Sequence, residues 1–219
     1  MKYLTLDEQK QLTKTVWGAK HAERDATIIE LFLNSGLRVS EMAGLLVGDV
    51  RNKQRLFVRP EIAKRRQRST PEGKPRPNSR FVPLHVKAQD LIHTWIRMKL
   101  ERRESIEDSA PLFVSRLGEP LTKRALQGMV EKWMVKAGLV SGTGEALFSV
   151  HSLRHTFAIQ FLERNGQSTK ALRSLQKILG HASLSSTGVY LEATDKEMAE
   201  TMHMMSLSNS RAERMRAAI

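Results

Sequence analysis

The sequence contains no cysteine, which excludes disulfide bonds, thiolate metal sites and catalysis by a cysteine nucleophile. No apolar run approaches the roughly 20 residues that a transmembrane helix requires. No apolar stretch follows the basic Met1–Lys2 start, so a signal peptide is not indicated either. We therefore expect a soluble, cytoplasmic protein with no membrane partner.

Aromatic residues are also scarce, at 5% of the chain, and only two of them are tyrosines, Tyr3 and Tyr190. Tyr190 closes the stretch LGHASLSSTGVY (179–190), whose residues from His181 onward are mostly small and polar. Such a stretch buries little apolar surface, so core packing does not explain why an aromatic hydroxyl is placed at its end.

What the chain does contain is enough apolar sequence for a core. Its 219 residues, 40% of them hydrophobic, suit one large domain or two small ones rather than a disordered chain. No internal repeat and no long linker divides it. We therefore expect a single domain over residues 1–219.

Positive charge is plentiful and unevenly distributed. The net charge is +13, and residues 51–80 alone hold 11 basic groups against 2 acidic ones. Concentrated positive charge attracts polyanions, of which nucleic acid is the commonest, although a solvated loop would look the same by composition. A basic membrane-surface helix is disfavoured, because prolines at positions 60, 71, 75 and 77 interrupt any continuous helix.

The pattern of elements predicts a mainly α-helical protein with a small antiparallel β-sheet, an α+β fold. Thr5 and Glu8 have the spacing of a capping box that starts a first helix, and Ser35–Gly36 interrupts the second. RLFVRPEIAK (55–64) and SRFVPL (79–84) alternate as strands do and belong to a basic hairpin region at residues 51–84. Further helices are predicted at about 122–138, 151–165, 168–179, 183–191 and 195–206.

The segment HSLRHTF (151–157) places His151, Arg154 and His155 on neighbouring positions of a helix. His151 and His155 have the i, i+4 spacing that can hold a metal, but the glutamate of the zinc-protease pattern is absent and an arginine lies between them. We therefore expect no metal and no other cofactor. His155 is interpreted as a structural histidine that is hydrogen-bonded in the core.

A different pairing suits the arginine. Arg154 and Arg38, in SGLRVSE, each offer a planar fork of donors that matches two phosphate oxygens and keeps its charge. Two such forks, a histidine and a tyrosine could stabilise a pentacovalent phosphorus while a phenolate attacks a phosphodiester.

The segments SGLRVSE, HSLRHTFA and LGHASLSSTGVY occur in this order, and together they resemble the tyrosine recombinase, or phage integrase, family. The resemblance covers essentially the whole chain as that family's catalytic domain. It implies that Arg38 and Arg154 clamp the DNA phosphate, that His181 bonds the same phosphate and that His151 helps to take the tyrosine proton. It implies that Tyr190 is the nucleophile.

The resemblance also implies a lysine that protonates the leaving 5′ oxygen. The favoured match is Lys64, in PEIAKRR, and Lys74, in EGKPR, is its rival because this hairpin is longer and richer in proline than usual. Glu41 resembles the family's acidic neighbour of the first arginine, with a structural role. Contacts to double-stranded DNA are expected from six basic residues of the hairpin region, namely Arg65, Arg66, Arg68, Lys74, Arg76 and Arg80.

The implied reaction cuts and rejoins DNA through a 3′-phosphotyrosyl intermediate, with a type IB topoisomerase or a non-catalytic DNA-binding regulator as alternatives. The resemblance further implies self-association on DNA into a tetramer, in which the tail at residues 195–219 docks on a neighbouring protomer. A methionine stripe at positions 198, 202 and 205 suits such docking, and equally suits packing on its own domain. The family's N-terminal DNA-clamping domain is missing, so the sequence is either a short form or a truncated chain.

Overall fold

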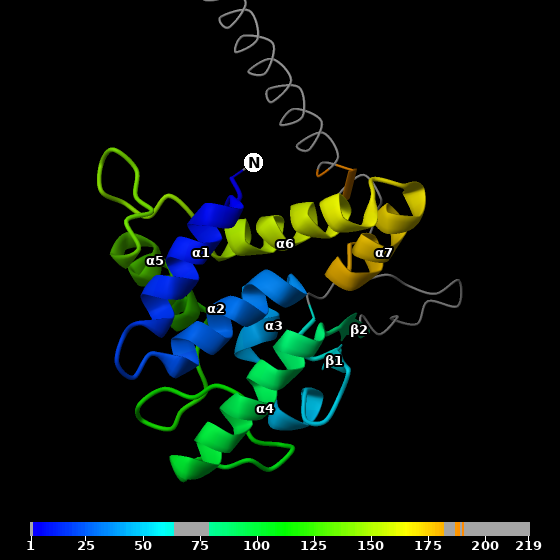
Figure 1. Cartoon of the computed structure of the whole chain (residues 1–219). Helices are drawn as coiled ribbons and strands as arrows, with labels where there is room; N and C mark the ends of the chain where they lie inside the picture. Colours follow the sequence, from blue (N-terminus) through cyan, green and yellow to red (C-terminus); the bar gives the residue numbers. More distant parts are fainter. Residues whose placement is uncertain (1, 64–78, 182–186, 189, 191–219) are drawn as a thin grey trace, which may run out of the picture.

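The computed structural model describes residues 2–63, 79–181, 187–188 and 190 (Figure 1). Helices predominate among these residues, with one two-stranded antiparallel sheet, as the sequence predicted. In chain order the elements are α1 (Leu6–Trp17), α2 (Glu23–Ser35), α3 (Val39–Ala43), the 3-10 helix η1 (Val47–Asp49), β1 (Arg55–Val58), β2 (Arg80–Pro83), α4 (Val86–Glu101), α5 (Lys123–Lys136), α6 (Val150–Asn165) and α7 (Thr169–Leu179).

Local capping fixes the start of α1. The side chain of Thr5 accepts a hydrogen bond from the backbone N–H of Glu8, and the Glu8 carboxylate accepts one from the backbone N–H of Thr5 at 2.7 Å. These two bonds satisfy donors that a helix start leaves free, and they confirm the predicted capping box.

Helix α2 is the central element of the fold and packs against α1, α4 and α6. Most of its residues are buried, including Ile28, Ile29 and Phe32. It ends at Gly36, which adopts the left-handed conformation with φ of 60°. A side chain at this position would overlap the ring of Phe157 on α6, so glycine allows both the turn and the close approach of α6.

The first strand of the hairpin is shorter than the sequence predicted. β1 and β2 pair antiparallel with Arg55 opposite Pro83 and Val58 opposite Arg80. The predicted first strand, 55–64, therefore ends at Val58, because the chain turns at residues 60–63. Proline 60 lacks the N–H that a strand would use for pairing, which accounts for the early end.

Buried side chains form two clusters among the described residues. The larger one is built from α1 to α5 and the first turns of α6. The smaller one joins the rest of α6 to α7 and includes Tyr190. Arg154 lies on α6 between Leu153 of the first cluster and Ala158 of the second, which places it at the junction of the two.

Some of the predicted elements lie partly or wholly outside the described residues. Of the helix predicted at 183–191, residues 187, 188 and 190 are helical, and the others lie outside the described residues. The helix predicted at 195–206 and the tail at 195–219 also lie outside them. No helix in the described part of the chain is long and apolar enough to cross a membrane.

Candidate active site

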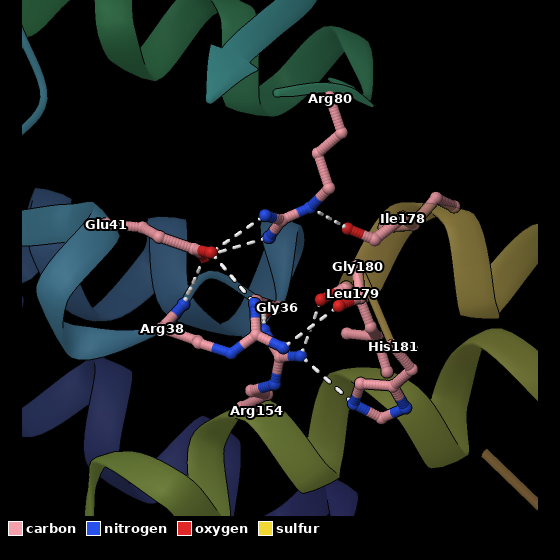
Figure 2. Close-up of polar contacts among 9 residues, drawn as sticks. All are labelled: Gly36, Arg38, Glu41, Arg80, Arg154, Ile178, Leu179, Gly180 and His181. Atoms are coloured by element: carbon pink, nitrogen blue, oxygen red, sulfur yellow. Dashed lines mark hydrogen bonds and ion pairs between the residues drawn. The ribbon is translucent and has the colours of Figure 1, made fainter. Parts of the chain in front are cut away.

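The last carbonyls of α7 are the centre of the site. The carbonyls of residues 178–180 each accept a hydrogen bond from one guanidinium group, at 2.6 to 3.2 Å (Figure 2). The donors are Arg38 just before α3, Arg80 on β2 and Arg154 on α6. A helix leaves its last carbonyls unpaired and carries partial negative charge at that end. Three guanidinium groups therefore meet here because the end of α7 attracts cations and supplies their acceptors.

Glu41 binds two of these arginines, Arg38 and Arg80. Its side chain is 0% exposed, and it accepts hydrogen bonds from the backbone and guanidinium N–H groups of Arg38 at 2.8 and 2.9 Å. Arg80 donates to both carboxylate oxygens at 2.7 and 2.8 Å. Burial alone would raise the pKa of Glu41, but the hydrogen bonds and charge of Arg80, and then those of Arg38, lower it to about 2. The carboxylate is therefore ionised at neutral pH.

Arg154 is buried, with 5% exposure, and joins the ends of two helices. Its guanidinium donates to the carbonyl of Gly36, which follows α2, and to that of Leu179 in α7 at 2.8 Å. A third contact, at 3.1 Å, joins it to Nε2 of His181. Burial, and then repulsion from Arg38, lowers the pKa of Arg154 to about 9, so the guanidinium stays protonated at neutral pH.

Tyr190 lies between two histidines. Its ring stacks on that of His181, with centroids 6.3 Å apart and planes 14° from parallel. Its hydroxyl lies 3.1 Å from Nδ1 of His155, within hydrogen-bonding distance. The residue is 3% exposed, and this burial raises the pKa of the phenol although the charges of Arg154 and Arg38 act in the opposite direction. The phenol is therefore protonated and enclosed.

His155 has a partner that the sequence did not indicate. It is hydrogen-bonded, as we expected of a structural histidine, but its partner is the hydroxyl of Tyr190. Burial first, and then the neighbouring His151 and Arg154, lower the pKa of His155 to about 4, so its imidazole is neutral near pH 7. The resemblance assigned the contact with the phenol to His151, and only the packing of residue 190 against α6 identifies His155 as the histidine that meets it.

The structure brings four of the six predicted catalytic residues together: Arg38, Arg154, His181 and Tyr190. His151 lies on the same helix one turn before His155, with its side chain exposed. The predicted residues Lys64, Arg65, Arg66, Arg68, Lys74 and Arg76 lie outside the described part of the chain.

Arg80 was predicted to contact DNA, yet its guanidinium is directed into the site. Its side chain is 9% exposed, and its donors bind Glu41 and the carbonyl of Ile178. These partners could not be predicted from the sequence, because both are far away along the chain.

The geometry suits a phosphate diester. Arg38, with its side chain 22% exposed, is the most accessible of the three guanidinium groups, and His181 lies next to Arg154. Fixed cationic donors of this kind stabilise the charge that develops on a phosphoryl group in the transition state. Among the described residues, no group of three or more His, Asp or Glu side chains is arranged to hold a metal ion.

Comparisons with known proteins identify the family. The model described as the phage integrase family matches residues 2–197, and the chain belongs to this family. Tyrosine recombinase XerC of Thermodesulfovibrio yellowstonii is 32% identical over 204 residues, which cover 91% of this chain and 60% of the relative. XerC of Haemophilus influenzae strain Rd is 34% identical over 177 residues, which cover 81% of this chain and 52% of the relative. The chain thus spans between half and two thirds of these relatives.

Solved structures share the fold. The crystal structure of XerA recombinase superposes with a TM-score of 0.70 at 25% identity, and the match covers 93% of this chain and 65% of that one. XerH site-specific recombinase bound to a palindromic difH substrate has a TM-score of 0.68 at 21% identity, over 92% of this chain and 52% of that one. The second likeness is one of fold alone.

The enclosed phenol can be tested by titration. In a Tyr3→Phe variant Tyr190 is the only tyrosine, so near-ultraviolet absorbance of phenolate reports on it alone. Because burial raises its pKa above the ordinary value of 10.0, we expect the folded variant to titrate at higher pH than the same variant unfolded in urea. Tyr190→Phe is the matched control and reports on Tyr3. Coincident curves for folded and unfolded Tyr3→Phe would contradict an enclosed phenol.

Proposed function

We propose that this chain supplies the catalytic part of a site-specific DNA recombinase that cuts and rejoins strands through a 3′-phosphotyrosyl link. The observation that carries the proposal is the convergence of Arg38, Arg154 and His181 beside Tyr190. Membership of the phage integrase family supports it, as do relatives named tyrosine recombinases. The substrate is double-stranded DNA, and residues 1–219 act as one catalytic domain.

In the proposed reaction Arg38 and Arg154 bind the non-bridging oxygens of the scissile phosphate, and His181 donates a further hydrogen bond. Tyr190 attacks phosphorus as the bond to the 5′ oxygen breaks. The phenolic proton passes to His151, because a neutral imidazole accepts protons near pH 7, and a hairpin lysine protonates the leaving oxygen. The ester conserves the energy of the broken bond, so a 5′ hydroxyl of a partner strand can reverse the step without a nucleotide cofactor.

The buried position of Tyr190 adds a step to this scheme. With 3% exposure and a hydroxyl bound to His155, the phenol is not accessible to a phosphate approaching from solvent. Tyr190 therefore leaves His155 when DNA binds. His155 serves as the partner of the phenol in the resting protein, while His151, which is exposed, is free to meet the substrate.

The nucleophile is tested with nicked duplexes, which trap covalent intermediates because the cut fragment diffuses away. A pool of nicked duplexes with random sequence, resolved on denaturing gels, identifies a cleavable site for the unmodified chain. On that site Tyr190→Phe should bind DNA and form no covalent adduct, because phenylalanine has no hydroxyl. Tyr3→Phe is the matched control and should keep full adduct formation. An adduct that persists in Tyr190→Phe excludes the assignment.

The hairpin region is tested by separating binding from protonation. Lys64→Ala should slow cleavage by about 100-fold or more, the usual effect of losing a general acid. A 5′-phosphorothiolate substrate, whose leaving group needs no proton, should restore the rate. The same pair of rates is measured for Lys74→Ala, and rescue of Lys74→Ala alone would move the general acid to Lys74.

The control for this experiment is the hairpin variant with Arg65, Arg66 and Arg68 changed to glutamine. These residues are proposed to contact phosphates together with Lys74 and Arg76. Their loss should reduce the slope of log affinity against log salt by about one for each contact. Sulfur in the leaving group should not rescue this variant. An unchanged slope would mean that the three arginines do not contact DNA.

We propose a tetramer at the paired sites, with the tail at residues 195–219 docked on a neighbouring protomer. Sedimentation of the full chain should give a monomer alone and higher assemblies on its site. Deletion from residue 195 should leave cleavage of single sites and abolish recombination of pairs. If the deleted protein unfolds, the tail belongs to its own domain and docking in trans is wrong.

A further inference from the structure

Arg80 connects three elements at the candidate site, and the reaction proposed above gives it no role. It lies on strand β2, donates to both oxygens of Glu41 on α3 and reaches the carbonyl of Ile178 on α7 at 2.6 Å (Figure 2). Three of its N–H groups are thus committed to protein acceptors. With 9% exposure of its side chain, it is poorly placed to bind DNA itself.

The hydrogen bonds to Glu41 occupy all the acceptor sites of its carboxylate. Two oxygens offer about four acceptor sites, and here they receive two bonds from Arg38 and two from Arg80. One of the bonds from Arg38 comes from its backbone, so only one N–H of its guanidinium is used by Glu41. A second guanidinium N–H binds the carbonyl of Gly180 at 3.2 Å. An arginine side chain has five N–H groups, so most of those of Arg38 are not bound to the carboxylate.

Without Arg80 the carboxylate would have two unfilled acceptor sites and one cationic neighbour in direct contact. Arginine and carboxylate bind best as parallel forks with two hydrogen bonds. The guanidinium of Arg38 is the nearest group able to make that arrangement, because it already donates to Oε1 of Glu41 at 2.9 Å. Glu41 would then take the donors that a phosphate needs.

We propose that Arg80 is a positioning residue, which occupies Glu41 so that the guanidinium of Arg38 remains directed at the scissile phosphate. The proposal rests on the proposed function and replaces the expectation that Arg80 contacts DNA. Arg80 thus supports the phosphate clamp through Glu41 and does not itself contact the substrate. Lysine cannot take over this role fully, because one ammonium group does not reproduce the planar fork that spans both carboxylate oxygens.

The test compares cleavage rates on two substrates by the same protein preparation. One substrate has an ordinary scissile phosphate, and the other a methylphosphonate, which carries no negative charge for the arginines to hold. The ratio of the two rates is independent of how much of the preparation is folded. Arg38→Ala sets the ratio expected when the clamp is lost, and Arg80→Gln should lower the ratio toward the same value.

Four further results are expected. Arg80→Gln should slow cleavage of the phosphate by about 100-fold, the scale of a small misplacement in an active site. Its salt dependence of DNA binding should match the unmodified chain, whereas loss of a direct contact would lower the slope by about one. Changing Glu41 to glutamine in the same chain should recover part of the rate and the ratio, because the competing charge is removed. Arg80→Lys should fall between Arg80→Gln and the unmodified chain.

A ratio that stays at the value of the unmodified chain, or a slope lowered by one, would overturn the proposal. A measurement without cleavage separates this outcome from failure of the proposed function. The side-chain Nε–H signal of Arg38 in an NMR spectrum, assigned by its loss in Arg38→Ala, should shift in Arg80→Gln and shift back when Glu41 is also changed. An unshifted signal overturns the proposal whatever the chain does to DNA.

Discussion

The arrangement of the site depends on one buried carboxylate. Glu41 has no exposed surface, and an ionised group in such a place is tolerated only when hydrogen bonds and opposite charge compensate it. Removing one partner of a buried ion pair typically costs about 3–5 kcal/mol, because the other charge stays uncompensated. Strand β2 and helix α3 must therefore lie together for Glu41 to be satisfied. Assembly of the proposed phosphate clamp and satisfaction of this charge therefore require the same packing of β2 on α3.

The second constraint is the meeting of two helix ends. Helices α2 and α7 both finish at a left-handed glycine, Gly36 and Gly180, and both point their last carbonyls at the guanidinium of Arg154. Partial negative charge at each end stabilises a cation that burial would otherwise disfavour. The carbonyls at these two helix ends fix the direction of the guanidinium, so the most buried cation of the site is also firmly oriented.

Features set by near neighbours were predictable from the sequence itself. Features set by distant neighbours were predictable only where the family resemblance supplied them, as for the meeting of Arg38, Arg154, His181 and Tyr190. The capping box at Thr5 and the break at Gly36 involve residues within a few positions, and the structure confirms both. The early end of β1, at Val58, had a local signal in Pro60, which the alternation of side chains obscured. The partners of Arg80 are 39 and 98 residues away, and Tyr190 is 35 residues from His155, so only tertiary packing could reveal them.

Tyr190 combines two environments that act on its pKa in opposite directions. Burial beside a neutral His155 keeps the phenol protonated and weakly nucleophilic, while the charges of Arg154 and Arg38 favour phenolate. Movement out of the buried position removes the first influence and leaves the second. In the proposed reaction the phenol is therefore a poor nucleophile while it is enclosed and a better one when it becomes accessible. In this proposal accessibility and activation come from a single displacement, so the proposed nucleophile stays buried and weakly reactive until DNA binds.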